Sequence, residues 1–184
     1  MILVALGANL PNPAIGSPLD ACETALEYLA QRGVVVERRS RWYRSVPVPQ
    51  SDQPDFVNGV ALVSSDLPPA ELLKLLHDIE AELGRTRDRP NEARVIDLDL
   101  LAHGDQVVGW TELSSTVPSL GSNRLILPHP RVHVRAFVLL PLRDVAPGWR
   151  HPVTGRDVGA MIEAISGDSE REGVFGDHVC KPLI

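Results

Sequence analysis

Apolar and polar residues alternate along the first hundred positions with two different periods, and each period predicts one kind of element. Short apolar runs predict strands over residues 2–6, 34–43, 56–63 and 94–103. Apolar residues three and four positions apart predict helices over residues 18–31 and 69–83. Ser17 is placed to cap the first helix, and Gly33 is placed to end it.

The expected order is strand–helix–strand–strand–helix–strand, which is typical of an α+β, ferredoxin-like βαββαβ fold. In such a fold an antiparallel sheet carries its helices on one face. At 184 residues the chain fits one domain. We expect this domain to span residues 1–184, with a core at about 2–145 and a C-terminal α/β extension at 146–184.

The pattern is less regular beyond residue 104. Residues 110–126 have the composition of an inserted loop, with the insertion itself at about 115–126. A helix is expected over 134–142, ending near Pro141, and another over 157–165. The last fifteen or so residues are polar and are expected to fray.

Composition and charge exclude several classes of protein. The net charge of -6 argues against binding to nucleic acid or to an anionic membrane surface. No apolar run is long enough to cross a membrane, and no secretion signal is recognised at the N-terminus. Cys22 and Cys180 are far apart and form no metal-binding pattern. We therefore expect a cytoplasmic protein with no membrane and no nucleic-acid partner.

The predicted strand 94–103 is unusual because two carboxylates, Asp97 and Asp99, interrupt its apolar run. Residues two apart on a strand share a face, so these carboxylates repel each other unless a cation lies between them. Mg²⁺ takes one or two carboxylates and completes its shell with water and substrate phosphates. The alternative is a solvent-facing pair on an edge strand. The tight apolar flanks and the nearby arginines favour a metal–phosphate site.

An arginine-rich segment precedes these carboxylates. It contains Arg85, Arg87, Arg89 and Arg94. Guanidinium groups match phosphate oxygens and can neutralise the charge that develops on a transferring phosphoryl group. The alternative is a solvated basic loop that pairs with Asp88, Glu92 and other acids, but its position beside the carboxylates favours phosphate binding.

Two further segments carry candidate chemistry. His129 lies between two prolines, and with Arg131 and Arg135 it offers three neighbouring donors that suit a polyphosphate. The proline-rich segment 46–58 ends in Phe56 and Asn58, an aromatic plane and an amide that can hold a flat heterocycle. The alternatives are that His129 is a surface or core residue, that Phe56 is a core residue and that Asn58 is a polar residue at the edge of the sheet.

Together these segments resemble the 6-hydroxymethyl-7,8-dihydropterin pyrophosphokinase family of folate biosynthesis over about residues 2–145. The resemblance rests on motifs that occur in the family's order. They are Gly7-Ala-Asn-Leu10, Tyr43-Arg44, Gln53-Pro-Asp-Phe-Val-Asn58, Ile79-Glu80, Gly84-Arg-x-Arg87, Arg94-Val-Ile-Asp-Leu-Asp-Leu100, Pro128-His129 and Arg135-Ala-Phe-Val-Leu-Leu-Pro-Leu142.

The resemblance implies ATP and 6-hydroxymethyl-7,8-dihydropterin as substrates. Asp97 and Asp99 would bind two Mg²⁺ ions together with ATP. Asn58 would hydrogen-bond the pterin between Phe56 and Phe137. Backbone groups would complete the pterin pocket at Ser45, Val46 and Val48.

The resemblance also implies the ATP-binding residues and the reaction. His129, Arg135 and Arg87 would contact the phosphates, and Glu80 would lie near the adenosine. Arg85 and Arg94 would be catalytic and close over the triphosphate. A pyrophosphoryl group would move from ATP to the pterin hydroxymethyl oxygen and release AMP, with no general base assigned. We expect a monomer, with a homodimer as the alternative.

The chain departs from the family pattern at several positions. Asn91-Glu92-Ala93 stands where Trp-Gly-Pro is common, so another side chain such as Trp110 would have to supply the stacking. Ala8, Val46 and Pro130 replace the usual serine, proline and tyrosine.

Two rival functions are weaker. A palm-type polymerase or nucleotide cyclase usually draws a carboxylate from its first strand, and residues 2–6 contain none. A ferredoxin-like RNA-binding module needs exposed aromatics and basic charge, whereas this chain is acidic with 4% aromatic residues.

Overall fold

Six strands form one antiparallel sheet in the computed structural model, which describes residues 1–48, 51–85, 92–110, 125–172 and 180–183. The strands are β1 (Ile2–Ala8), β2 (Val35–Arg39), β3 (Tyr43–Ser45), β4 (Phe56–Ser64), β5 (Asp97–His103) and β6 (Lys181–Pro182). Their order is β5-β1-β4-β3-β6, and β2 also pairs with β4. The expectation of a single antiparallel sheet with helices is confirmed.

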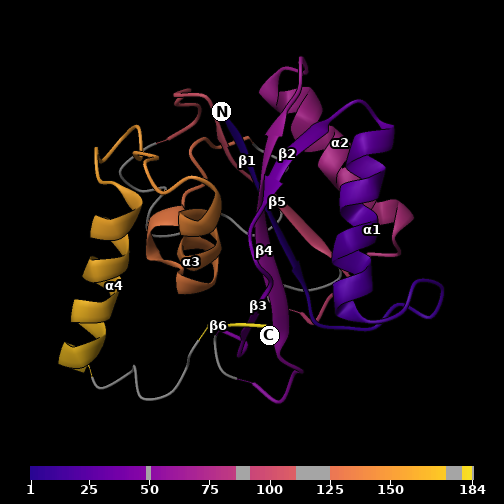
Figure 1. Ribbon diagram of the computed structural model, residues 1–184, viewed down its shortest axis with the longest axis horizontal. Coiled ribbons are helices and arrows are strands. Elements are labelled where there is room, and N and C mark those ends of the chain that lie inside the picture. The colour runs from indigo at the N-terminus through magenta and orange to yellow at the C-terminus, as the bar shows by residue number, and fades with distance from the viewer. Residues whose placement is uncertain (49–50, 86–91, 111–124, 173–179, 184) are drawn as a thin grey trace.

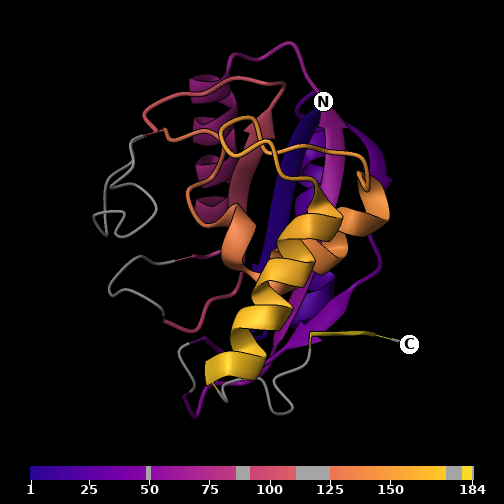
Figure 2. The same ribbon diagram turned by 90° about the vertical axis from the view of Figure 1, so that its left-hand side faces the viewer.

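Helices cover both faces of this sheet (Figure 1), so the expectation of helices on one face is wrong for α3 (Ala136–Val145), which lies within the expected core of about residues 2–145. The helices α1 (Pro18–Gln31) and α2 (Pro69–Glu82) lie on one face, as expected for the helices of the βαββαβ unit. The opposite face carries α3, and α4 (Val158–Glu172) packs outside α3 (Figure 2). A short 3₁₀ helix, η2 (Val132–Val134), precedes α3. None of the described helices is long and apolar enough to cross a membrane.

The sequence signals at the ends of α1 work as predicted. The Ser17 hydroxyl accepts a hydrogen bond from the Asp20 N–H at 3.3 Å, and the Asp20 carboxylate accepts one from the Ser17 N–H at 2.8 Å. This reciprocal capping box satisfies two backbone donors at the start of the helix. Gly33 follows the helix with a φ of 80°, a left-handed conformation that glycine adopts without strain.

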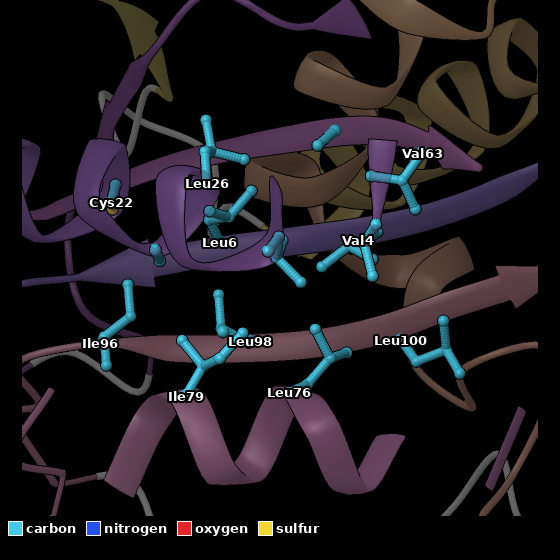
Figure 3. Close-up of a cluster of buried hydrophobic side chains, with 14 of the residues drawn as sticks. Val4, Leu6, Cys22, Leu26, Val63, Leu76, Ile79, Ile96, Leu98 and Leu100 are labelled. Carbon is cyan, nitrogen blue, oxygen red and sulfur yellow. The ribbon is translucent and has the colours of Figure 1, made fainter. Parts of the chain in front are cut away.

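The two faces of the sheet have separate apolar cores. In the α1 and α2 core, Leu76 and Ile79 point from α2 toward Leu98 and Leu100 of β5 (Figure 3). The other core is formed by residues of β1, β4, the end of β5, α3 and α4, and it includes Trp149. Successive residues of a strand therefore point to the two cores in turn. Where a polar residue takes the place of an apolar one, the core on that face is interrupted.

Several expected elements differ in their bounds, and two of these differences follow from long-range hydrogen bonds and packing. The strand expected over 34–43 is two strands, since Ser40 breaks it by donating from its hydroxyl to the Arg41 carbonyl at 2.6 Å. The same hydroxyl accepts the Val60 N–H, so β4 stays satisfied across the break. Pro141 does not end α3, which continues to Val145 because Leu142 and Val145 are buried against the sheet.

The C-terminal region is also more ordered than expected where the structure describes it. The helix expected over 157–165 extends to Glu172. Lys181 and Pro182 form β6, which pairs with β3, and the Leu183 N–H donates to the Trp42 carbonyl at 2.7 Å. The prediction of a frayed end is therefore wrong for residues 180–183. These residues cover the edge of β3.

Candidate functional site

The two carboxylates of β5 lie on the sheet face that carries α3. Leu98 and Leu100 belong to the core under α1 and α2, so Asp97 and Asp99 project from the opposite face. Both oxygens of Asp97 have a guanidinium partner. Arg85 Nη1 lies 2.5 Å from Oδ1, and Arg94 Nη1 lies 2.6 Å from Oδ2.

Glu80 supports this arrangement from the end of α2. Its side chain is 1% exposed, and Oε1 accepts the Leu98 N–H of β5 at 2.7 Å. The same oxygen forms an ion pair with Arg85. The expected contact of Glu80 with ATP stays a prediction. The contacts of Glu80 position the Arg85 guanidinium relative to β5.

Asp99 lies beside a histidine and an arginine from the segment before α3. His129 Nε2 and Arg135 Nη1 are each 3.8 Å from Asp99 Oδ2. Burial alone would raise the pKa of Asp99, but His129, Arg135 and the two arginines on Asp97 together lower it. Asp99 is therefore ionised at neutral pH, as a metal ligand must be.

His129 is held in one tautomer. The Arg131 N–H donates to its Nδ1 at 3.1 Å, so the ring proton of the neutral form is on Nε2, toward Asp99. Burial lowers the pKa of His129, an effect that the Asp99 charge opposes and the Arg135 charge reinforces. At neutral pH the ring is therefore a neutral donor. It can offer a hydrogen bond to a phosphate oxygen without carrying a charge.

The strand register connects Asp97 to Asn58 through a glycine. Gly7 of β1 pairs with Asn58 of β4 on one side and with Asp97 of β5 on the other. Ala5 and Val60 lie in the core under α3, so the alternation places Gly7 and Asn58 on that same face. Neighbouring strands are about 4.8 Å apart, so the Asn58 and Asp97 backbones are separated by about 10 Å. Between them Gly7 presents no side chain.

The expected pterin residues gather at the end of β3 and β4. The Asn58 amide donates to Ser45 Oγ at 2.9 Å, and both residues are buried. Phe56 pairs with Ser45 and is half-buried, whereas Val48 is 71% exposed. Half-buried Val46 follows Ser45 along the chain. This end of the sheet thus presents an aromatic ring and a fixed amide side by side.

Phe137 is the second residue of α3, and the Arg135 guanidinium lies 5.4 Å from the centre of its ring. This contact joins the expected pterin residue to the expected phosphate residue. The expected placement of a pterin between Phe56 and Phe137 stays a prediction, as does the contact of each residue with its substrate.

Sequence reasoning assigned no role to Asn9, which is 1% exposed. Its Oδ1 accepts the Arg94 N–H at 2.8 Å, and its Nδ2 donates to the Pro54 carbonyl at 3.1 Å and to Gln53 Oε1 at 3.3 Å. Asn9 therefore joins the proline-rich segment to the segment that carries Arg94. The sequence does carry a signal for a role of Asn9, because it is a polar residue directly after a buried strand, inside the Gly7-Ala-Asn-Leu10 motif.

Several expectations fall on residues outside those described. Arg87, Arg89 and Asn91 lie there, as does the segment 111–124 of the expected insertion. Trp110 is described, and its ring packs against His133 and edge-on against His151. These contacts engage the side chain that was considered as a replacement for the loop tryptophan.

The donor set fits a hard divalent cation that is shared with a substrate. Asp97 and Asp99 supply carboxylate oxygens, the ligand type that Mg²⁺ prefers. Among the described residues no group of three or more acidic, histidine or cysteine side chains could hold a metal ion. A cation at β5 would therefore complete its shell with water and with oxygens of a bound phosphate.

Comparison with known proteins identifies the class of enzyme. A 2-amino-4-hydroxy-6-hydroxymethyldihydropteridine pyrophosphokinase of Pseudomonas aeruginosa is 39% identical over 163 residues, 89% of this chain and 90% of the relative. The enzyme of the same name from Synechocystis is 38% identical over 164 residues, 89% of this chain and 75% of the relative. The chain is thus a diphosphotransferase of the pyrophosphokinase type.

The family follows from a match along most of the chain. The sequence model of the 7,8-dihydro-6-hydroxymethylpterin-pyrophosphokinase family matches residues 3–147. The chain belongs to this family, whose members act in folate biosynthesis.

A solved structure shows the same fold. It is that of Plasmodium falciparum HPPK-DHPS with pterin and p-hydroxybenzoate, which superposes with a TM-score of 0.69 at 15% identity. The superposition covers 95% of this chain but 45% of that one, so this chain spans less than half of its length.

Proposed function

We propose that this enzyme catalyses the Mg²⁺-dependent transfer of pyrophosphate from ATP to 6-hydroxymethyl-7,8-dihydropterin in tetrahydrofolate biosynthesis. The products are AMP and the pterin diphosphate. The observation that carries the proposal is the pair Asp97 and Asp99, which lies within ion-pair reach of Arg85, Arg94 and Arg135 on the sheet face shared with Asn58. The monomeric state and the cytoplasmic location stay predictions.

In this proposal the two substrates bind along one cross-strand row of the sheet. Asn58 and Phe56 bind the pterin at the β4 end, and the hydroxymethyl group extends over Gly7 toward Asp97. His129 and Arg135 bind the phosphates on the Asp99 side. Held this way, the hydroxymethyl oxygen faces the β-phosphorus, and positioning supplies most of the rate enhancement. Two Mg²⁺ ions bound with ATP would neutralise phosphate charge and orient the reacting oxygens.

The arginines change partners during binding. Before substrate binds, Arg85 and Arg94 occupy both oxygens of Asp97, which leaves that carboxylate with no free oxygen for a cation. A triphosphate offers these guanidinium groups a stronger anionic partner. Arg85 and Arg94 then move to the phosphates, where they stabilise the developing charge, and Asp97 becomes available as a ligand. Nucleotide binding thereby prepares the metal site.

Glu80 acts in this scheme as a positioning residue. Its carboxylate stays on the Leu98 N–H and keeps the Arg85 side chain at the edge of the site. A buried anion beside Asp97 also keeps the local charge balanced while two arginines are present.

The isosteric substitutions Asp97→Asn and Asp99→Asn test the proposal. Each removes one anionic ligand without changing side-chain volume, so pterin-dependent AMP formation should fall by about 100-fold or more. The exposed Asp105→Asn removes the same charge on the turn after β5 and should keep wild-type turnover. Circular dichroism checks that each variant is folded. Wild-type turnover in a folded Asp97→Asn or Asp99→Asn variant would exclude the metal assignment.

A further inference from the structure

The strand β3 carries the residue that holds the proposed pterin amide, although it is only three residues long. Ser45 Oγ accepts the hydrogen bond from the Asn58 amide at 2.9 Å. β3 lies between β4 and β6, and β6 has only two residues. Strands of this length form few ladder hydrogen bonds, so the position of β3 also depends on the contacts of its side chains.

The side chain of Tyr43 connects β3 to α3. Tyr43 pairs with Asn58 in the strand register and is 2% exposed. Its hydroxyl donates to Asp144 Oδ2 at 3.0 Å. Because Tyr43 and Ser45 are two residues apart on one strand, they lie on the same face of the sheet, the face that carries α3 and Asn58.

Asp144 holds this hydroxyl as part of a network with Arg41. The guanidinium group binds both carboxylate oxygens, with Nε 3.1 Å from Oδ2 and Nη2 2.9 Å from Oδ1. Nη2 also donates to the Tyr43 hydroxyl oxygen at 3.0 Å. Burial raises the pKa of Asp144, but the hydrogen bonds from Arg41 and Tyr43 outweigh this effect and lower it. The carboxylate is therefore ionised at neutral pH, and hydrogen bonds to an anion are the stronger kind.

The residues proposed to bind the metal and the phosphates come from other elements. Asp97 and Asp99 lie on β5, and His129 and Arg135 precede α3. Asn58, in contrast, is joined to β3 twice, through the Ser45 hydroxyl and through its pairing with Tyr43. A displacement of β3 would therefore act first on the pterin side of the site.

We propose that Tyr43 is a positioning residue for the pterin, which it orients through Ser45 and Asn58. Asp144 fixes the Tyr43 hydroxyl to α3, and the backbone of β3 carries this constraint over two residues to Ser45, which holds the Asn58 amide. A binding group that is already ordered gains affinity because no ordering cost arises on binding. The inference rests on the proposed function, because it takes the pterin as the ligand of Asn58.

Tyr43→Phe removes the hydroxyl and keeps the ring, so steady-state kinetics of the full chain test the inference. The KM for the pterin should rise by about fivefold or more, whereas the KM for ATP should stay within about twofold. Tyr28→Phe is the matched control, because it removes the same group from a partly buried ring on α1, at the other face of the sheet. Both KM values should be unchanged in this variant.

Asp144→Ala removes the acceptor of the same hydrogen bond and should raise the KM for the pterin by a similar factor. If the two residues act through one contact, the KM of the double variant should lie within about twofold of either single variant. Arg41→Gln changes a side chain that is 60% exposed and leaves Tyr43 and Asp144 in place. It should fold as the wild type does and raise the KM for the pterin by about twofold or more.

An unchanged KM for the pterin in a folded Tyr43→Phe variant would overturn the inference. A parallel rise of both KM values with a lower melting temperature would also overturn it, because it would indicate a purely structural role. Multiplicative effects of Tyr43→Phe and Asp144→Ala would show that the two residues act independently and would exclude the path through their contact. Failure of the wild type to form AMP with the pterin would instead contradict the proposed function.

Discussion

Gly7 lies between the residues proposed to bind the pterin and those proposed to bind the metal and phosphates. A Cβ added there would lie 3.3 Å from Asn58 Oδ1, closer than most carbon contacts in proteins. The Asn58 amide already donates to Ser45, so its oxygen remains directed over Gly7 as an acceptor. Glycine at this position therefore keeps the path from Asn58 to Asp97 open. The φ angle of Gly7 is not positive, so the requirement concerns space and not backbone conformation.

Gly7→Ala should therefore impair the pterin site without straining the backbone. The added methyl group displaces the Asn58 amide, and such overpacking typically costs about 1–3 kcal/mol. We expect the KM for the pterin to rise by about tenfold, while the KM for ATP stays within about twofold. Gly148→Ala is the matched control, because nothing lies within 4 Å of its added Cβ. An unchanged KM for the pterin in Gly7→Ala would show that the substrate does not cross Gly7.

For single residues, the sequence predicts the chemical type of the side chains at the site better than it predicts the contacts that they make. The shared face of Asp97 and Asp99 followed from strand periodicity, because position on a strand determines direction. The burial of Glu80 could not be predicted in the same way. It depends on α2 ending beside β5, which brings the carboxylate to the Leu98 N–H. The tautomer of His129 likewise depends on a backbone N–H two residues along the chain.

Among the elements, the segments around residues 51–55 and 92–94 are joined by a single side chain. Asn9 accepts from the Arg94 N–H and donates to the Pro54 carbonyl. Its backbone N–H also donates to the Arg94 carbonyl at 3.0 Å. The segment before the proposed pterin residues and the segment that carries Arg94, the proposed phosphate-binding arginine, thus share one anchor, so a displacement of one is transmitted to the other.

Asn9→Ala should loosen both segments together. The substitution leaves the Arg94 N–H without an acceptor, at a cost of about 1–3 kcal/mol. Hydrogen exchange should accelerate at Arg94 and near residues 51–55, and kcat should fall. Asn12→Ala removes a buried amide that donates to the Leu83 carbonyl at 2.7 Å, so it should destabilise the fold without accelerating exchange in those two segments. Faster exchange in only one segment of Asn9→Ala would contradict the shared anchor.

The elements that the sequence predicted well are those with local signals. The bounds of α1 follow from its capping box and from Gly33, both visible in the chain. The division of the 34–43 strand and the continuation of α3 through Pro141 depend instead on long-range contacts. Ser40 bonds to Val60 of another strand, and Leu142 is buried against the sheet. Such contacts override local propensity.

For the whole molecule, the two-sided sheet explains why the site forms where it does. The face under α1 and α2 is a continuous apolar core, whereas the α3 face changes from apolar residues to Asn58, Gly7 and Asp97 along one cross-strand row. The α3 segment adds Arg135 and Phe137 to that row. The sequence predicted the sheet and most of these side chains, but the row itself depends on strand register.

The central claim is that this row directs the transfer of a pyrophosphoryl group to a pterin hydroxymethyl oxygen. Mass spectrometry of the products formed from ATP, Mg²⁺ and 6-hydroxymethyl-7,8-dihydropterin tests it most directly. We predict equal amounts of AMP and pterin diphosphate, with no AMP formed when the pterin is omitted. Formation of ADP with a pterin monophosphate, or of no product that depends on the pterin, would contradict the account.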